Sequence, residues 1–426
     1  MLIPIETTTK LDTNIFFEKL DNGLEVYVVP KKNINNIYAT FTTKFGSRTN
    51  EFVPLGEKDF IKAPEGIAHF LEHKAFEQKD GIDPFTFFSA NGCDSNASTD
   101  RFKTSYLFAG PNHFKENMNY LLDFVQEPYF TDENVEKEKG IIEQEIKMYK
   151  DQPFREGYDR VILNSFVKNP VKYSVGGSVE SIKKITKEDL YKCYNTFYNP
   201  NNMIVVVTGN VKPKEVIEVI KENQEQKELK KMVEIKTKEY KEPDTVDKEF
   251  EEIKMNVTIP KLLLSYKFNI EALKDDIDLN YYFSLYGDLK FGATSILADK
   301  LKEQKIITSD IDFTLLKIDN HLLVVFDAET NKTKELVGII KKEFKNFDVK
   351  KEDFERKKKA ILAACIYMSD NIYSLNNKIT NDIIHYNKVI NDMYDNIKKL
   401  DFEKMKEIIT NLDFSNTATV IINSKE

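Results

Sequence analysis

The sequence is poor in the residues that define several classes of protein. It has no tryptophan, five histidines and three cysteines among 426 residues. Cys93, Cys193 and Cys365 are far apart and odd in number, which excludes a disulfide framework and a cysteine-based metal site. This use of cysteine predicts reduced thiols and a cytoplasmic protein.

Long apolar runs and an excess of basic residues are also missing. No stretch approaches the ~18 apolar residues of a membrane span, and residues 1–14 lack the basic and apolar segments of a signal peptide. The formal net charge is −8, and the lysines are interleaved with glutamates. We therefore expect neither nucleic acid nor a membrane as a partner.

The length and the order of apolar segments predict two similar domains. Residues 227–250 are rich in lysine and glutamate, contain Pro243 and lack helical periodicity, which is typical of a linker. Residues 1–226 and 251–426 each begin with strands, are helix-rich in the middle and end with an apolar strand. We expect an α+β fold of two domains, each an antiparallel or mixed sheet covered by helices.

Periodicity and turn residues place the individual elements. The expected strands lie at 16–31 (a hairpin), 37–46, 95–109 (a pair), 203–208, 251–269, 310–328 (a pair) and 417–422. One expected helix begins at Pro64. The other expected helices lie at 83–91, 114–125, 131–150, 186–198, 213–226, 271–288, 295–305, 331–346, 351–387 and 401–411.

Two of the five histidines stand in one short motif, His69-x-x-Glu72-His73. On a helix the two histidines share a face and can bind one metal ion, while Glu72 can reach a water on that metal. This is the H-x-x-E-H order of the inverzincins. Its chance expectation in such a chain is about 0.005. The alternative is a surface helix with an incidental histidine pair.

A catalytic zinc usually has a third protein ligand, often an acid on another helix. The helix expected at 131–150 offers Glu138 and Glu145 on one stripe with Ile141 and Ile142. Carboxylates on an apolar stripe are costly unless a cation satisfies them. Periodicity alone leaves open that this stripe is ordinary helix surface.

Together these segments resemble the pitrilysin/insulinase family of zinc metallopeptidases. The similarity includes the H-x-x-E-H motif with Phe76, the segment Asn96-Ala97-Ser98-Thr99, residues 138–153, residues 170–186 and residues 197–211. It is strong over about residues 15–215 and weak beyond residue 250. The nearest pattern is that of short two-domain bacterial members of the YmfH-like type, which are related to mitochondrial processing peptidase.

The resemblance implies a role for each matching residue. His69, His73 and Glu145 would bind one zinc ion, Glu72 would be the general base, and Glu138 would orient a ligand. Phe76 would line the pocket for the residue after the scissile bond. Asn96 and Ala97 would lie on an edge strand that pairs with an extended peptide. Zinc is preferred over manganese or cobalt only by this set of ligands.

The second half departs from the family pattern. Family members usually carry an arginine and a tyrosine there that bind substrate. The matching positions hold Lys302 and either Thr308 or Ser309, and lysine does not replace a bidentate arginine. A two-domain chain is also half of the four-domain clamshell of full-length members. We expect a homologous second subunit to supply the arginine and tyrosine, with a homodimer as the alternative.

The expected activity is that of a zinc endopeptidase that cleaves unfolded peptides or processes precursor peptides. Two other classes remain open. One is a non-catalytic, zinc-stabilised subunit of a peptidase complex, and the other is a zinc hydrolase on an unrelated fold.

Overall fold

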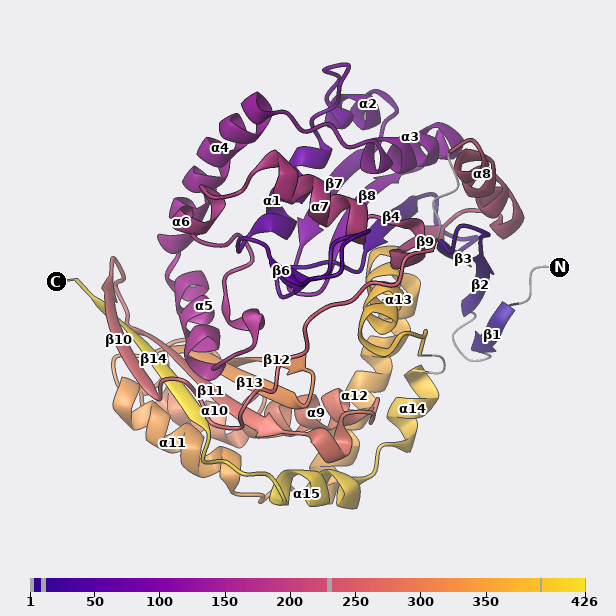
Figure 1. Cartoon of the computed structure of the whole chain (residues 1–426). Helices are drawn as coiled ribbons and strands as arrows, with labels where there is room; N and C mark the ends of the chain where they lie inside the picture. Colours follow the sequence, from indigo (N-terminus) through magenta and orange to yellow (C-terminus); the bar gives the residue numbers. More distant parts are fainter. Residues whose placement is uncertain (1–3, 9–12, 228–231, 391–392, 426) are drawn as a thin grey trace. The chain divides into compact units, whose positions relative to one another are not determined.

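The computed structural model describes residues 4–8, 13–227, 232–390 and 393–425 (Figure 1). The chain forms two compact units that are not contiguous in sequence. Unit 1 consists of Met1–Ile146, Ser174–Glu239 and Cys365–Asp392, and unit 2 consists of Lys147–Tyr173, Tyr240–Ala364 and Met393–Glu426. The expected domains at 1–226 and 251–426 were contiguous, whereas each unit of the structure contains a segment from the other half of the chain.

The expected linker at 227–250 is divided between the units. Residues 228–231 lie outside the described residues, residues 232–239 belong to unit 1 and residues 240–250 to unit 2. Across the described ranges, no helix is both long and apolar enough to cross a membrane.

Unit 1 is built on a seven-stranded sheet in the order β1-β2-β3-β9-β4-β8-β7. Neighbouring strands are antiparallel except for the parallel pair β3 and β9. The strands are β1 (Pro4–Thr8), β2 (Thr13–Lys19), β3 (Glu25–Pro30), β4 (Ile37–Thr43), β7 (Asp94–Thr99), β8 (Thr104–Gly110) and β9 (Met203–Gly209). The strands expected in the first half are confirmed. A separate pair, β5 (Glu51–Phe52) and β6 (Ile61–Lys62), lies outside this sheet.

Helices cover both faces of this sheet because its central strands are apolar on both sides. On β9, Val205 and Val207 join the core under the helices of the first half, whereas Ile204 and Val206 pack against α13. The helices of unit 1 are α1 (Ile67–Ala75), α2 (Pro84–Ala90), α3 (Phe114–Gln126), α4 (Asp132–Lys150, whose last four residues belong to unit 2), α6 (Val179–Ile182), α7 (Lys187–Phe197), α8 (Pro213–Glu225) and α13 (Ile372–Tyr386), with a 3-10 turn at Pro200–Asn202.

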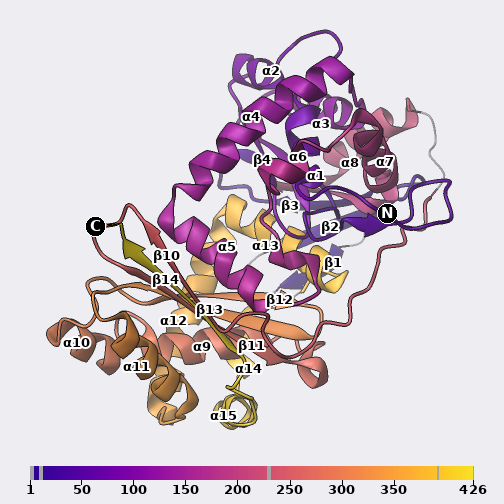
Figure 2. The same cartoon turned by 60° about the vertical axis from the view of Figure 1, so that its left-hand side comes forward.

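Unit 2 is built on a five-stranded sheet in the order β10-β14-β11-β13-β12 (Figure 2). Only β10 and β14 are parallel neighbours. On β11, Ser265 and Lys267 face α5 and the loop after it, whereas Tyr266 and Phe268 face α9 and α11. The strands are β10 (Phe250–Met255), β11 (Lys261–Asn269), β12 (Asp312–Ile318), β13 (His321–Glu329) and β14 (Thr417–Ser424).

The helices of unit 2 differ from expectation at three points. α5 (Pro153–Ser165) was not expected, α14 (Met393–Lys399) is additional, and the single helix expected at 351–387 is two helices. The break falls at Asn371, whose side chain accepts a hydrogen bond from the Ser374 backbone and so begins α13. The others are α9 (Leu279–Phe291), α10 (Ile296–Glu303), α11 (Thr333–Lys345), α12 (Lys351–Asp370, which ends in unit 1) and α15 (Phe402–Thr410), with 3-10 turns at Pro170–Lys172 and Glu271–Leu273.

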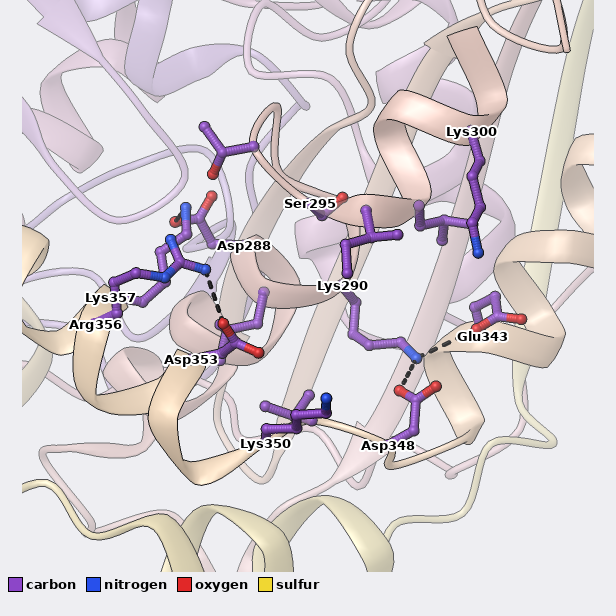
Figure 3. A pocket seen from close by; sticks show the side chains of 15 residues that line it. Asp288, Lys290, Ser295, Lys300, Glu343, Asp348, Lys350, Asp353, Arg356 and Lys357 are labelled. Atoms are coloured by element: carbon purple, nitrogen blue, oxygen red, sulfur yellow. Dashed lines mark hydrogen bonds and ion pairs between the residues drawn. The ribbon is translucent and has the colours of Figure 1, made fainter. Parts of the chain in front are cut away.

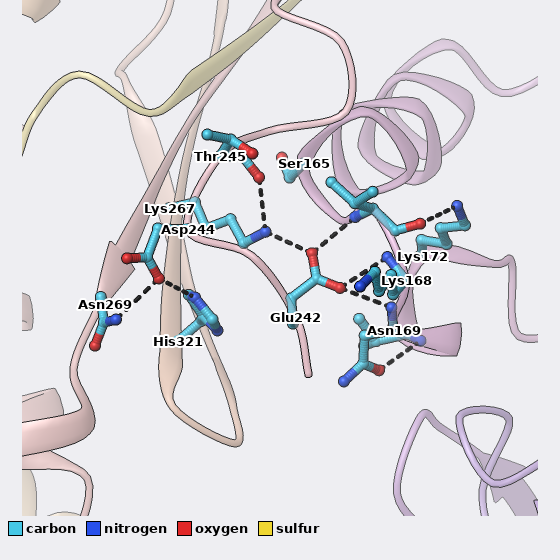
Figure 4. Close-up of polar contacts among 12 residues, drawn as sticks. Ser165, Lys168, Asn169, Lys172, Glu242, Asp244, Thr245, Lys267, Asn269 and His321 are labelled. Atoms are coloured by element: carbon cyan, nitrogen blue, oxygen red, sulfur yellow. Dashed lines mark hydrogen bonds and ion pairs between the residues drawn. The ribbon is translucent and has the colours of Figure 1, made fainter. Parts of the chain in front are cut away.

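A buried carboxylate fastens the part of the expected linker that belongs to unit 2 (Figure 4). Glu242 accepts hydrogen bonds from three successive backbone N–H groups, those of Val167, Lys168 and Asn169, at 2.7–2.8 Å. It also pairs with the fully buried Lys267 at 2.6 Å. Burial alone would raise the pKa of Glu242, but these donors lower it below its usual range. The ion pair therefore joins α5, β11 and the chain entering β10.

Candidate metal centre

Helix α1 presents two different stripes of side chains. Ile67, Phe70, Leu71 and Lys74 are buried, at the i, i+3, i+4, i+7 spacing of a core-facing stripe. The second stripe, one step around the helix, carries His69, Glu72 and His73, all partly buried. The helix was expected to begin at Pro64, but it begins at Ile67. Gly66 has a φ of 87°, which is a left-handed conformation that an α-helix cannot include.

Close backbone packing holds the start of α1 in place. A β-carbon on Gly66 would lie 2.4 Å from the carbonyl oxygen of Gly176, and one on Gly177 would lie 2.4 Å from that of Glu65. Both glycines have positive φ, at 87° and 72°. The Ser181 hydroxyl donates to the same Glu65 carbonyl at 2.8 Å. Glycine is therefore required at both positions where the 174–178 loop contacts α1.

Three side chains of unit 1 converge at one point. Nε2 of His69 lies 3.7 Å from Oε1 of Glu145, and Nε2 of His73 lies 3.3 Å from Oε2 of Glu145. The three ligand atoms lie within 4.8 Å of one another. Ligand atoms at the usual bond lengths from a tetrahedral zinc are about 3.4 Å apart. Two imidazoles and a carboxylate at this spacing fit a zinc ion, so these residues could hold one.

Glu138 contacts the opposite side of His73. Its Oε1 lies 3.0 Å from Nδ1 of His73, so a proton on Nδ1 would leave Nε2 free for a metal. Burial alone would lower the pKa of His73, but the hydrogen bonds with Glu138 and Glu145 raise it to about 9. A metal must therefore displace a proton from this ring when it binds.

The stripe expected on α4 is partly wrong. Ile141 was expected to face the core, but it is 49 % exposed. The buried stripe is Val135, Glu138, Ile142 and Ile146, and Glu145 lies at its edge with 21 % of its side chain exposed. The two acids therefore differ in environment: Glu138 lies within the buried stripe, with 10 % of its side chain exposed, and Glu145 lies at the edge of that stripe.

Glu72 lies beside the candidate metal ligands and next to the end of β7. The Thr99 hydroxyl donates a hydrogen bond of 2.5 Å to Oε2 of Glu72. Burial raises the pKa of Glu72 above its usual range, and the hydrogen bond from Thr99 opposes that rise. A carboxylate with a raised pKa beside a metal can take a proton from water and give it up again.

The expected substrate-binding residues lie on two neighbouring elements of unit 1. Phe76 caps the C-terminal end of α1 and stacks on Phe85, with ring centroids 4.6 Å apart and planes 7° apart. Asn96 and Ala97 lie on β7, the last strand of the sheet, where exposed and half-buried residues alternate. Oδ1 of Asn96 accepts from the backbone N–H of Ala97 at 2.8 Å. A peptide that adds to this edge would compete for that N–H group.

Lys302 and Thr308, which were expected at the arginine and tyrosine positions of the family pattern, have partners within unit 2. Lys302 pairs with Asp310 at 2.5 Å, and the Thr308 hydroxyl donates to the Glu329 carbonyl at 3.3 Å. A pocket of about 440 Å³ near α10 and α11 is lined by paired charges, such as Lys290 with Asp348 and Arg356 with Asp353 (Figure 3).

Among the residues that the structure describes, His69, His73 and Glu145 form the one group suited to a metal.

Sequence reasoning missed several residues that support the site. Lys74 is fully buried and pairs with Glu77, and its Nζ lies 3.9 Å from Oε2 of Glu138. Its place on the apolar stripe of α1 was a usable signal, because a lysine is rarely buried without an acidic partner. Thr99 gave no such signal, since its contact with Glu72 joins distant parts of the chain.

The helix with two histidines and a glutamate, the third acid and the edge strand form a candidate metal centre with the residue order of the inverzincins. Two family models match the chain. Residues 57–178 match the insulinase family, peptidase family M16, and residues 184–361 match the peptidase M16 inactive domain. The uncharacterized zinc protease YmfH of Bacillus subtilis is 45% identical over 322 residues, which are 74% of this chain and 74% of YmfH. This chain belongs to the insulinase family of peptidases.

Solved structures agree with this assignment. An M16-like peptidase structure from Alicyclobacillus acidocaldarius has a TM-score of 0.91 and 29% sequence identity, covering 98% of this chain and 100% of that chain. A protease from Helicobacter pylori, at 20% identity, has the same fold with a TM-score of 0.83, covering 96% of this chain and 99% of that chain. The α+β fold of two sheet-and-helix domains is confirmed, and an unrelated fold is excluded.

Proposed function

We propose that this protein is a zinc-dependent endopeptidase that hydrolyses extended, unfolded peptides. The observation that carries this proposal is the convergence of His69, His73 and Glu145 with Glu72 beside them. The description of its relatives as zinc proteases supports the same activity. A non-catalytic, zinc-stabilised subunit would not need Glu72 at this position.

Each residue of the site has a task in this proposal. His69, His73 and Glu145 would hold the zinc, and Glu138 would keep His73 in the tautomer that binds it. A bound zinc would supply Lewis acidity, polarising the peptide carbonyl and activating a water. Glu72 would accept the proton of the attacking water and pass it to the leaving amine. The raised pKa of Glu72 suits both steps.

The proposed substrate is an extended peptide because an edge strand recognises backbone. β7 has no partner strand on its outer side within the described chain. Its half-buried face touches α1, so a peptide added along its outer edge would run close to Glu72. Phe76, stacked on the 41 % exposed Phe85, offers an aromatic surface for the residue that follows the scissile bond.

We further propose that a homologous second subunit completes the site in the cytoplasm. The reason is that the family positions for arginine and tyrosine hold Lys302 and Thr308 or Ser309. Purification from the native source tests this point. A second M16 chain that copurifies and raises activity is expected, whereas a single chain with full activity contradicts the partner.

The decisive test is cleavage of an unstructured, internally quenched peptide by the zinc-loaded chain, with Glu72→Gln as the control. We expect cleavage by the wild type and a loss of at least about 10³-fold in the variant, with the same zinc content. Near-normal turnover by Glu72→Gln would contradict the role of Glu72. If no peptide is cleaved either with or without the partner subunit, the proposed peptidase activity is contradicted.

A further inference from the structure

The last residue of β7 contacts the proposed general base. Ser95, Ala97 and Thr99 alternate with exposed residues and form the half-buried face of the strand. Ala97 packs against the core of unit 1 on that face. Two residues further on, the Thr99 hydroxyl lies 2.5 Å from Oε2 of Glu72. The strand proposed to pair with the peptide therefore also contacts the residue proposed to move the proton.

The carboxylate determines the direction of this hydrogen bond. An ionised carboxylate only accepts, so the Thr99 hydroxyl donates to Oε2 of Glu72. Thr104, which pairs with Thr99 across β7 and β8, donates its own proton to the Phe45 carbonyl at 2.9 Å. Its oxygen lies 3.2 Å from that of Thr99, farther than the carboxylate oxygen of Glu72. The shorter contact with the charged acceptor is the one that takes the proton of Thr99.

The contact engages one carboxylate oxygen of Glu72. An ionised carboxylate accepts at both oxygens, so Oε1 can still take a proton while Oε2 is held. A hydrogen bond from a hydroxyl to a charged carboxylate is short and strong, as the 2.5 Å distance reflects. The carboxylate is thereby restrained in rotation about its terminal torsion, which is otherwise broad.

We propose that Thr99 is a positioning residue that holds Glu72 in the orientation needed for proton transfer. This inference rests on the proposed function. Thr99 and Ala97 lie on the same face of one short strand. The strand would therefore fix the position of Glu72 relative to the backbone of a peptide that pairs with it. A small displacement of a reacting group can cost about 10²-fold in rate.

The first experiment compares steady-state cleavage by the wild type, Thr99→Val and Thr99→Ser, all zinc-loaded. Thr99→Val keeps the shape and removes the hydroxyl. We expect kcat to fall about 10- to 100-fold, with KM and zinc content unchanged. Thr99→Ser restores a hydroxyl and is expected to recover kcat to within about threefold. Adding Thr99→Val to Glu72→Gln should cause no further loss, because the two residues act through one step.

The matched control is Thr42→Val. Thr42 is fully buried in the same sheet. Its hydroxyl forms a hydrogen bond of 2.8 Å with the hydroxyl of Ser105 and not with Glu72. Its loss is expected to lower stability without changing kcat. Equal kcat values for Thr99→Val and Thr42→Val would overturn the proposal, as would a loss of zinc from Thr99→Val that accounts for its fall in activity.

A structural measurement keeps the inference separate from the peptidase activity. In a crystal structure of the zinc-loaded wild type, we expect Oε2 of Glu72 within hydrogen-bond distance of the Thr99 hydroxyl. In Thr99→Val the carboxylate should turn away while the zinc ligands stay in place. A wild-type carboxylate that points away from Thr99 would overturn the positioning role, whatever peptide the protein cleaves.

Discussion

The two units repeat one strand order with different chemistry. In unit 1 the strands β3-β9-β4-β8-β7 follow the same sequence of parallel and antiparallel neighbours as β10-β14-β11-β13-β12 in unit 2. Helix α1 follows β4, and α9 occupies the same place after β11. The repeat expected from the order of elements is therefore present in the topology.

The difference lies in the side chains of those two helices. α9 buries aromatic residues, among them Tyr282, Phe283 and Tyr286, and carries no histidine. α1 has a narrower apolar stripe and leaves His69, Glu72 and His73 only partly buried. The edge strands β7 and β12 are both half exposed. The scaffold and its edge are shared, and a few side chains on α1, together with the acids of α4, make the candidate site.

The largest expected effect comes from removing the third ligand. Glu145→Ala should weaken zinc binding by at least about 100-fold, because loss of even an outer partner of a ligand costs 10- to 100-fold. Metal content after dialysis measures this effect. Glu136→Ala, an exposed acid on the same helix, is the control and should keep its zinc. An unchanged zinc content in Glu145→Ala would contradict Glu145 as the third ligand and would make Glu138 the next candidate.

The buried lysines of the two units make a second comparison. Lys74 and Lys267 both have fully buried side chains paired with glutamates. Replacing either with methionine should lower the free energy of unfolding by about 3–5 kcal/mol, since the buried acids Glu138 and Glu242 lose the lysine that faces them. Chemical unfolding measures the loss. A cost near zero at either position would show that the acids find other partners.

Zinc should distinguish these two variants. Without Lys74, the acids around His73 carry an uncompensated negative charge, so bound zinc should stabilise this variant more than it stabilises the wild type. Lys267 pairs with Glu242 in unit 2, and its variant should gain no more from zinc than the wild type does. Equal stabilisation of both variants by zinc would show that Lys74 does not influence the candidate metal site.

A pH-dependent effect on stability is expected in unit 2. Burial and the facing Asp312 raise the pKa of Asp327 from 3.8 to about 6. The protonated form is favoured in the folded state, so the contribution of Asp327 to stability is fully present below about pH 4 and is lost as the pH rises through 6. Asp327→Asn should therefore gain about 1–2 kcal/mol at pH 8, a value reduced for solvent screening, and nothing at pH 3.5.

The control for this measurement is Asp312→Asn, which removes the facing charge and leaves Asp327 partly buried. Its gain should be smaller, because burial is the larger cause of the shift. A gain of Asp327→Asn that is independent of pH would exclude titration of Asp327 as the cause.

The smallest effect is expected at Lys302. Its ion pair with Asp310 is exposed on both sides, so Lys302→Ala should change stability by less than about 0.5 kcal/mol. If a partner supplies the substrate clamp, the variant should also cleave peptide within about twofold of the wild-type rate. A loss above tenfold would instead give Lys302 itself the role of the missing arginine.

Local patterns accounted for much of the molecule. The spacing of His69 and His73 places both on one helix face, and the helix expected at 186–198 is α7, which begins with a capping box at Thr186. The hairpins and the final strand β14 follow from turns and apolar runs of a few residues. Each of these features depends on neighbours within about one or two turns, so the sequence was sufficient to predict them.

The remainder needed contacts between distant segments. The apolar faces of β9 and β11 require cover on both sides, but only the tertiary structure assigns α13 to one sheet and α5 to the other. Glu138 and Glu145 are two turns apart on one helix, so their spacing could not tell which contacts Nδ1 of His73 and which lies near Nε2. The contact of Thr99 with Glu72 likewise depends on how β7 packs against α1, because packing joins residues that the sequence keeps apart.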